Sequence, residues 1–230
     1  NSFLDGSKPS TESTAVSNAT GLGVPSNGLL YPPASVEDIP YVTRPISEGG
    51  VLERKGMVEV ISSLETDGRK IPYDIRMGVW VTVEAETDYI KNCFEEYNAH
   101  TDPSGRYFTL YKRWHLIGLE VGVSVASVAL RNEPTGVAIG WNADVVATAK
   151  RDLKPGDMLD GEGGYTVWGK LLPAATSKRM GGVPLGLAHG VKVIRPVAKG
   201  QSLTWDDVAM DTSTHAYKIR REMEATSVLG

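Results

Sequence analysis

The chain has 230 residues, of which 41% are hydrophobic and 23% are charged, and its net charge at pH 7 is −4. These values are typical of a globular protein with one large domain or two small ones. The negative charge excludes a basic field for binding nucleic acid or an anionic membrane. A single cysteine, Cys93, excludes an intrachain disulfide and a thiolate zinc cage, and it fits a cytoplasmic location. The longest apolar run, near residues 118–130, is interrupted by Glu120 and is too short to span a bilayer.

Residues 1–143 predict an α+β domain in which an antiparallel sheet is backed by helices. The predicted elements, in chain order, are a helix at 10–19, a Gly- and Pro-rich loop at 21–50, strands at 57–64, 75–85 and 106–113, and helices at 88–97 and 116–130. Thr87 is placed to cap the helix at 88–97. The small residues of the helix at 116–130 would allow close packing on the sheet, so we expect that helix to be central.

A second part of the chain begins near residue 144. Short β-rich runs at 145–149, 165–168 and 191–194 are separated by glycine turns and predict a small all-β domain over residues 144–211. Residues 212–230 form a tail that is predicted to be helical at 216–225.

This second part contains an internal repeat. Residues 151–159 and 195–203 both read Arg-x-aliphatic-x-x-Gly-x-x-Leu, 44 positions apart. The pattern predicts positive φ angles at Gly156 and Gly200. Approximate symmetry would bury Leu153 and Leu159 against Val197 and Leu203, their equivalents in the second repeat. Behind the second copy, Thr204 is placed to cap a single helical turn.

The two repeats, the sequence Gly-Leu-Ala-His-Gly-Val at 186–191 and the Trp-Asp-Asp-Val that follows at 205–208 resemble a SAF domain. This small β-clip module is shared by sialic acid synthases, type III antifreeze proteins and flagellar P-ring assembly proteins. The resemblance implies a β-clip over residues 144–211 that binds or positions a ligand and leaves the chemistry to other parts of the chain.

A wider resemblance rests on five stretches, namely residues 3–8, 28–33, 50–56, 76–81 and 160–170. Together they resemble predicted homoserine dehydrogenases with a C-terminal SAF domain, a family that includes 1-deoxy-D-xylulose 5-phosphate reductoisomerase-like enzymes. Members begin with a Rossmann domain that binds NAD(P). The sequence Gly21-Leu22-Gly23 lacks the third glycine of that fingerprint, and the chain starts at Asn1. We therefore expect NAD(P) to be bound mainly by an N-terminal domain absent from this chain.

The candidate acid/base residues are Asp5, Lys8, Glu12 and His115. Lys8 and Glu12 are i,i+4 neighbours if a helix begins near residue 6. A lysine held by carboxylates can protonate a substrate oxygen during hydride transfer, although an ordinary solvated ion pair is the alternative. His115 and Glu120 could form an acid/base pair or half of a metal site, and the alternative is a capping histidine with a glutamate that accepts backbone hydrogen bonds. No metal site is predicted.

The candidate substrate-binding residues are Arg54, Lys55 and Arg76, which could hold a phosphate or carboxylate. An exposed charged turn and an edge-strand charge are the alternatives.

The resemblance thus implies the C-terminal catalytic and SAF portion of an NAD(P)-dependent oxidoreductase, inactive as an isolated fragment. Its expected partners are a small polar hydroxy or keto substrate, with phosphorylated compounds among the candidates, and further copies of itself in a homo-oligomer. The alternative is a non-catalytic SAF-type module for carbohydrate or ligand binding, or for assembly.

Overall fold

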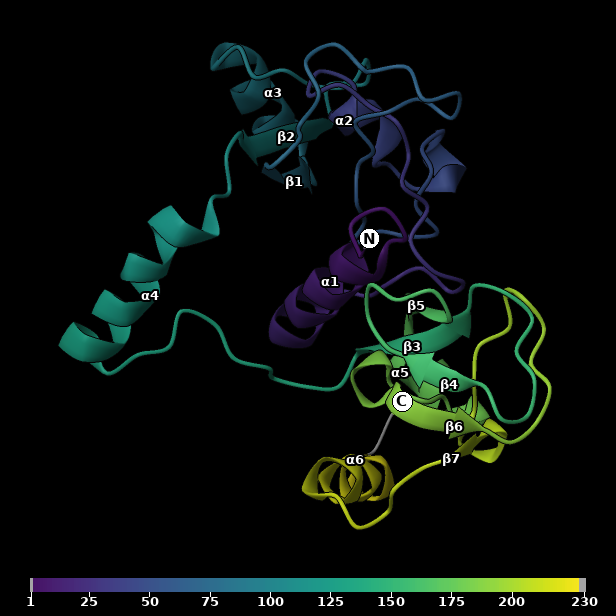
Figure 1. Ribbon diagram of the computed structural model, residues 1–230. Coiled ribbons are helices and arrows are strands. Elements are labelled where there is room, and N and C mark those ends of the chain that lie inside the picture. The colour runs from purple at the N-terminus through teal and green to yellow at the C-terminus, as the bar shows by residue number, and fades with distance from the viewer. Residues whose placement is uncertain (1, 228–230) are drawn as a thin grey trace. The chain divides into compact units, whose positions relative to one another are not determined.

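The computed structural model describes residues 2–227, which fold into two compact units (Figure 1). Residues 30–56 and 60–137 form one, here called the β1–β2 unit. Residues 2–29, 57–59 and 138–227 form the other, here called the β3–β7 unit. Both contain helices and small antiparallel sheets, so the predicted α+β class is confirmed.

The β1–β2 unit is built on a two-stranded antiparallel sheet. Strand β1 (Val79–Glu84) pairs with β2 (Tyr107–Lys112), with Val81 opposite Leu110. The helical elements of this unit are α2 (Ile39–Val42), the 3-10 helix η1 (Ile46–Glu48), α3 (Asp88–Glu96) and α4 (Ile117–Arg131). Thr87 caps α3 as predicted, because its side chain accepts a hydrogen bond from the Ile90 amide. A small core surrounds Ile39, which is fully buried.

The predicted strand at 57–64 is wrong. These residues form only isolated bridges, such as those between Gly23 and Met57 and between Pro33 and Ser62. The partners come from the proline-rich loop, and Pro32 and Pro33 have no amide to extend a ladder. The sheet therefore has two strands, not three.

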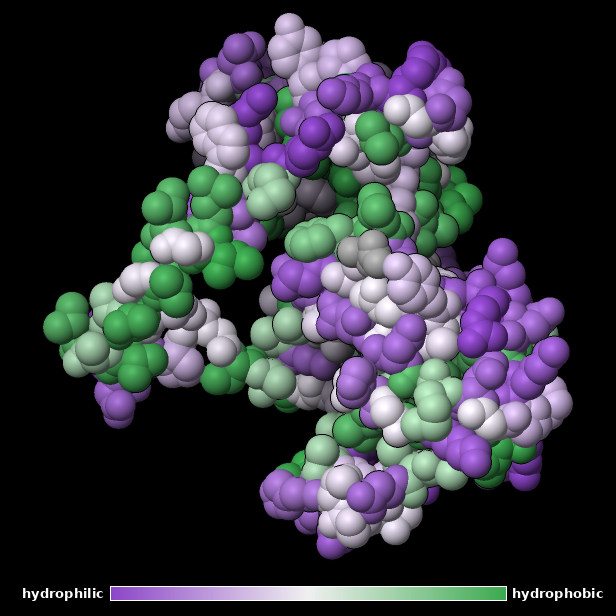
Figure 2. Space-filling model, in the orientation of Figure 1, coloured by the Kyte–Doolittle hydropathy of each residue, from purple (hydrophilic) through white to green (hydrophobic). Residues whose placement is uncertain are grey.

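The predicted central position of α4 is also wrong. Among its residues only Ser127 is buried, and its aliphatic side chains are exposed. Apolar residues cover the surface of this helix in Figure 2. The small residues of α4 would allow close packing, but within residues 2–227 no sheet packs against them.

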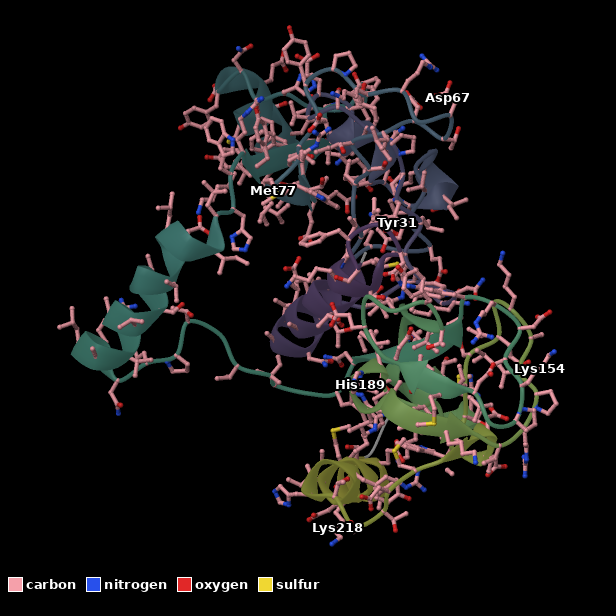
Figure 3. The ribbon with its side chains drawn as sticks, viewed as in Figure 1. Tyr31, Asp67, Met77, Lys154, His189 and Lys218 are labelled. Carbon is pink, nitrogen blue, oxygen red and sulfur yellow. The ribbon has the colours of Figure 1, made fainter. Side chains whose placement is uncertain are left out.

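The β3–β7 unit contains two further sheets. Strands β3 (Ala143–Ala149) and β5 (Val167–Pro173) pair antiparallel, and β4 (Met158–Asp160), β6 (His189–Val193) and β7 (Val208–Ala209) form the other sheet. Figure 3 shows His189 on β6. The helical elements are α1 (Ser7–Thr20), α5 (Ala174–Met180), α6 (His215–Thr226) and the 3-10 helices η2 (Leu185–Leu187) and η3 (Trp205–Asp207).

Helix α1 packs on β3 and β5 through serines. Its buried residues are Ser7, Ser10, Ser13 and Ser17. Small side chains at this spacing let the helix backbone approach the sheet closely. The Gly169 amide donates a hydrogen bond of 2.8 Å to Ser7 Oγ. A Cβ atom at Gly169 would lie 2.5 Å from a Val145 methyl carbon, so this contact requires glycine.

The predicted repeat is a structural repeat with approximate two-fold symmetry. Leu153 and Val197 exchange both backbone hydrogen bonds, at 2.8 and 3.1 Å. The Gly156 amide donates to Val193 O at 2.8 Å, and the equivalent Gly200 amide donates to Ala149 O at 2.8 Å. Both glycines have positive φ, 100° and 83°. The four repeat aliphatics are all buried in one core, as predicted.

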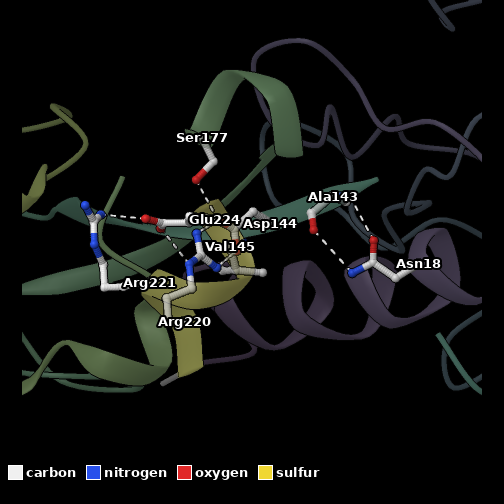
Figure 4. A network of polar contacts seen from close by, with 8 residues as sticks. All are labelled: Asn18, Ala143, Asp144, Val145, Ser177, Arg220, Arg221 and Glu224. Carbon is white, nitrogen blue, oxygen red and sulfur yellow. Dashed lines mark hydrogen bonds and ion pairs between the residues drawn. The ribbon is translucent and has the colours of Figure 1, made fainter. Parts of the chain in front are cut away.

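The C-terminal helix α6 is fastened to β3 by a buried ion pair (Figure 4). Arg220 donates two hydrogen bonds to Asp144, at 2.5 and 3.1 Å, and one to Glu224 at 2.8 Å. Asp144 also accepts a hydrogen bond from Ser177 on α5. The predicted helical tail is therefore part of the β3–β7 unit.

Candidate functional site

Asp5 and Lys150 form an ion pair at the start of α1. Their carboxylate and ammonium atoms lie 2.6 Å apart, and their side chains are 15% and 21% exposed. The Ser7 amide donates to the same carboxylate at 2.8 Å. Burial raises the pKa of Asp5, but hydrogen bonds from Lys150 and Ser7 outweigh burial, so the pKa lies below its ordinary value. Asp5 is therefore ionised at neutral pH and holds the Lys150 ammonium in place.

The loop between β4 and β5 lies beside this pair. Lys150 donates a hydrogen bond to Gly164 O. Asp160 fixes the loop by accepting hydrogen bonds from the Tyr165 amide at 2.6 Å and the Thr166 amide at 3.0 Å. Burial raises the pKa of Asp160, but these bonds and that of the Thr166 hydroxyl lower it below its ordinary value. A Cβ at Gly164 would collide with the Asp160 carboxyl group, so the loop requires glycine there.

The pair and the loop border an open hollow of about 330 Å³. Its lining residues are Leu4, Asp5, Lys150, Gly164 and Tyr165. The stretches 3–8 and 160–170, which are more than 150 positions apart in the sequence, thus meet at one site. It offers an ammonium and a carboxylate next to an exposed tyrosine, and this set can bind a small polar molecule.

Lys8 and Glu12 form the i,i+4 ion pair that the sequence predicts. Their charged atoms lie 3.0 Å apart on α1, and the Lys8 side chain is one-third exposed. Exposed pairs of this kind contribute about 0.3–0.5 kcal/mol. Glu12 therefore restrains Lys8 only weakly, and the partly exposed side chain of Lys8 can reach a ligand.

Lys55 is held within the β1–β2 unit by two carboxylates. It lies 2.6 Å from Glu84 and 3.3 Å from Glu48, and the Tyr107 hydroxyl donates to Glu48 at 2.6 Å. The hydrogen bond to Glu84 raises the pKa of Lys55 well above its ordinary range, although partial burial opposes the shift. Burial, followed by the contact with Glu48, raises the pKa of Tyr107 to about 12. This network ties the 50–56 loop to β1 and β2.

The other predicted residues of the β1–β2 unit lie apart from this network. Arg54 is exposed and makes no ion pair with any residue in the range 2–227. Arg76 pairs with Asp74 at 3.4 Å. His115 Nδ1 and the Lys112 ammonium both contact the Glu120 carboxylate, so the predicted His115–Glu120 pair is present.

The structure thus divides the predicted residues between the units. Asp5, Lys8 and Glu12 lie in the β3–β7 unit, and the other four lie in the β1–β2 unit. The sequence prediction missed Lys150 and Tyr165. Tyr165 belongs to a stretch that carries the family resemblance, which could have identified it, whereas the contact of Lys150 with Asp5 spans 145 positions and no spacing rule indicates it.

The described residues contain neither a cluster of metal ligands nor a Rossmann sheet. In residues 2–227 no three His, Cys, Asp or Glu side chains come together as a metal site. Separately, none of the helices in this range is long and apolar enough to cross a membrane. The named sheets are antiparallel, whereas a dinucleotide-binding domain is built on parallel strands with a glycine-rich turn.

Comparison with known proteins gives one family. No curated protein matches the chain. Residues 1–121 match the family model described as "Oxidoreductase DRL, catalytic domain". The match contains Asp5, Lys8, Glu12 and all four predicted residues of the β1–β2 unit, and it ends within α4. Because it covers more than half of the 230 residues, the chain belongs to the oxidoreductase DRL catalytic-domain family.

Proposed function

We propose that this chain is the substrate-binding and catalytic part of an NAD(P)-dependent oxidoreductase that acts on a small polar hydroxy or keto compound, such as a phosphorylated one. The observation that carries the proposal is the pair of lysine–carboxylate contacts at the start of α1, in which Asp5, Lys8 and Glu12 lie inside the matched residues 1–121 and Lys150 lies outside them. Lys8 is accessible beside Glu12, and Asp5 holds Lys150 at an open hollow.

Lys8 is the proposed proton donor. When a carbonyl group is reduced, its oxygen gains a proton, and a lysine ammonium can donate it. The partial exposure of Lys8 lets it recover that proton from water. Glu12 and Asp5 would keep the local charge balanced, and His115 is a second proposed acid/base group, oriented by Glu120.

The proposed anion-binding residues are Arg54, Lys55 and Arg76. Arg54 is exposed and unpaired within the described part of the chain, so it is the most available. To bind the substrate anion, Lys55 would give up its contact with Glu84, and Arg76 would give up its contact with Asp74. We also propose Lys150 as a contact for the substrate anion, because its ammonium lines the hollow and an ammonium can donate hydrogen bonds to a phosphate or carboxylate.

The proposed site of NAD(P) lies outside residues 2–227. The described sheets are antiparallel and are not those of a Rossmann domain, so the chemistry proposed for these residues is binding and proton transfer. We also propose that residues 144–211 are a SAF-like β-clip. The two-fold hydrogen-bond pattern of the repeats supports this resemblance.

The test is turnover of the full-length protein with Lys8→Met. The readout is nicotinamide absorbance with a panel of hydroxy, keto and phosphorylated compounds. Loss of a general acid lowers kcat by about 10²–10⁴-fold, with little change in KM. Lys218→Met, at an exposed position on α6, is the matched control and should keep full activity. Unchanged turnover of Lys8→Met would refute the role of Lys8.

The second candidate is a non-catalytic ligand-binding module. It is favoured by a hollow of about 480 Å³ in the β3–β7 unit, beside the second repeat. Lys178, Arg179, Arg221 and Trp205 contribute to its lining, and the buried indole N–H of Trp205 has no partner among residues 2–227. Anionic sugars that quench Trp205 fluorescence, in a protein without nicotinamide-dependent turnover, would support this candidate over the oxidoreductase.

A further inference from the structure

Helix α4 directs its polar side toward its own neighbouring segments. Ser127 donates to Glu133 O at 2.9 Å, and the hydroxyls of Ser124 and Thr135 lie 2.8 Å apart. Glu120, on the same side, contacts Lys112 and His115. At 3.6 residues per turn these residues fall within one narrow strip of the helix surface. The polar groups of α4 are therefore largely satisfied within the β1–β2 unit.

The rest of the α4 surface is apolar and uncovered. Seven aliphatic side chains on it are between 53% and 83% exposed, namely Ile117, Leu119, Val121, Val123, Val125, Val128 and Leu130. By helical geometry they form two ridges, and Gly118, Gly122, Ala126 and Ala129 lie in the groove between them. No atom lies within 4 Å of a Cβ built at Gly118 or Gly122, so the groove is open. A helix with so wide an apolar surface is normally buried.

Strand β1 of the same unit adds a second uncovered apolar face. Val79, Val81 and Val83 alternate outward, with Leu110 of β2 beside Val81. The opposite face carries the hydroxyls of Thr82 and Thr109, which lie 2.7 Å apart, and Thr43 at the end of α2 contacts the Thr82 hydroxyl at 2.8 Å. Apolar and polar side chains therefore alternate along β1, and the polar face is the covered one.

We propose that the apolar surface of α4 is the contact surface for a second copy of this chain, with two α4 helices packed ridge into groove. Complete burial of one aliphatic side chain removes roughly 60–120 Å² of apolar surface from water, and each Å² contributes about 25 cal/mol to the free energy of association. Seven half-exposed side chains thus supply roughly 300–500 Å² per copy, and the β1 valines raise this toward the ~800 Å² per partner of a standard interface. A surface of two ridges around a groove can match its own copy across a two-fold axis.

A membrane is the less suitable partner. Membrane-binding amphipathic helices carry several Lys or Arg residues on the polar side, to attract anionic lipid. The polar strip of α4 carries one basic residue, Arg131, whose guanidinium contacts Ser127 and Glu133. The association also does not depend on the proposed oxidoreductase activity.

The test is sedimentation velocity of the full chain across micromolar concentrations. We expect a dimer, and we expect Leu119→Lys together with Val123→Lys to raise its Kd by at least about a hundredfold, as for central interface residues. Ile46→Lys is the matched control, because Ile46 is 63% exposed and Val123 is 67% exposed. The control should dimerise like the unaltered chain.

A second readout separates association from misfolding. Self-association makes the Tm rise with protein concentration, and this rise should disappear in the double lysine variant while its circular dichroism spectrum stays unchanged. A chain that is monomeric at every concentration would overturn the proposal. A dimer unaffected by the lysines would overturn it too. Binding of a monomeric chain to phosphatidylcholine–phosphatidylserine vesicles would assign α4 to a membrane instead.

Discussion

Replacing Arg220 by methionine should destabilise the β3–β7 unit by about 3–4 kcal/mol. Arg220 and Asp144 form a two-pronged pair whose side chains are 11% and 9% exposed. Removing one partner of a buried pair costs about 3–5 kcal/mol, because the other charge is left without compensation. Asp144 keeps the hydrogen bond from Ser177, which favours the lower end of that range. Methionine preserves much of the aliphatic packing but loses the guanidinium contact with the Trp141 ring, at 4.8 Å.

The assay is urea unfolding followed by tryptophan fluorescence. For a chain of this length about 3 kcal/mol corresponds to a Tm decrease of roughly 6–12 °C. Asp144→Asn and the double variant complete a cycle, and we expect a coupling energy of at least about 1 kcal/mol. Arg195→Met is the control, since its 3.4 Å pair with Asp206 is exposed, and it should change stability by less than about 0.5 kcal/mol. An effect of Arg220→Met as small as the control, or strictly additive effects, would refute the reasoning.

Three further predictions concern stability. Burial raises the pKa of Asp102, but hydrogen bonds from neighbouring amides and a hydroxyl lower it below its ordinary value, so its contribution is complete above about pH 4 and is lost as the pH falls through the lowered pKa. Acid titration of Asp102→Asn should accordingly show a flatter loss of stability below pH 4 than the unaltered chain, and identical slopes would contradict this. Gly50→Ala should cost about 2 kcal/mol or more in urea unfolding, because its Cβ would lie 2.0 Å from a backbone oxygen, and a neutral result would be inconsistent with that contact. Leu153→Ala and Leu203→Ala should each cost about 2–5 kcal/mol, since both side chains are fully buried in the repeat core, and Tm values near that of the unaltered chain would argue against the shared core.

Local signals in the sequence predicted the four longest helices, but they did not predict α2, η1 or α5. The cap at Thr87 forms as expected, and Thr204 with Asp207 forms a capping box at η3. Helix α1 was predicted to begin at residue 10 but begins at Ser7, because Gly6 takes up positive φ and ends the preceding turn. Such features depend on neighbours within four residues, and the sequence contains all of that information.

Features that depend on distant partners could not be predicted in the same way. The alternation in β1 identifies two faces, but it does not say which one the unit covers, and here the threonine face is inside. The run at 57–64 has strand composition, yet its partners are proline-containing segments that cannot sustain a ladder. Both outcomes are decided by contacts between segments that are distant in sequence.

The repeat shows how a site residue can be added to a symmetric scaffold. The two copies begin at Arg151 and Arg195, and the residue just before each copy is Lys150 in the first and Ile194 in the second. These residues follow Ala149 and Val193, whose carbonyl groups accept the hydrogen bonds from Gly200 and Gly156. Both have an amide bonded within the β3–β7 unit, to Thr166 O and Asp207 O, so the scaffold tolerates either side chain. Only the first copy places an ammonium next to Asp5. Because the symmetric position holds an isoleucine, the backbone pattern of the repeat does not require a lysine there, and the contact of Lys150 with Asp5 is specific to the first copy. This difference between the copies agrees with the proposed contact of Lys150 with the substrate.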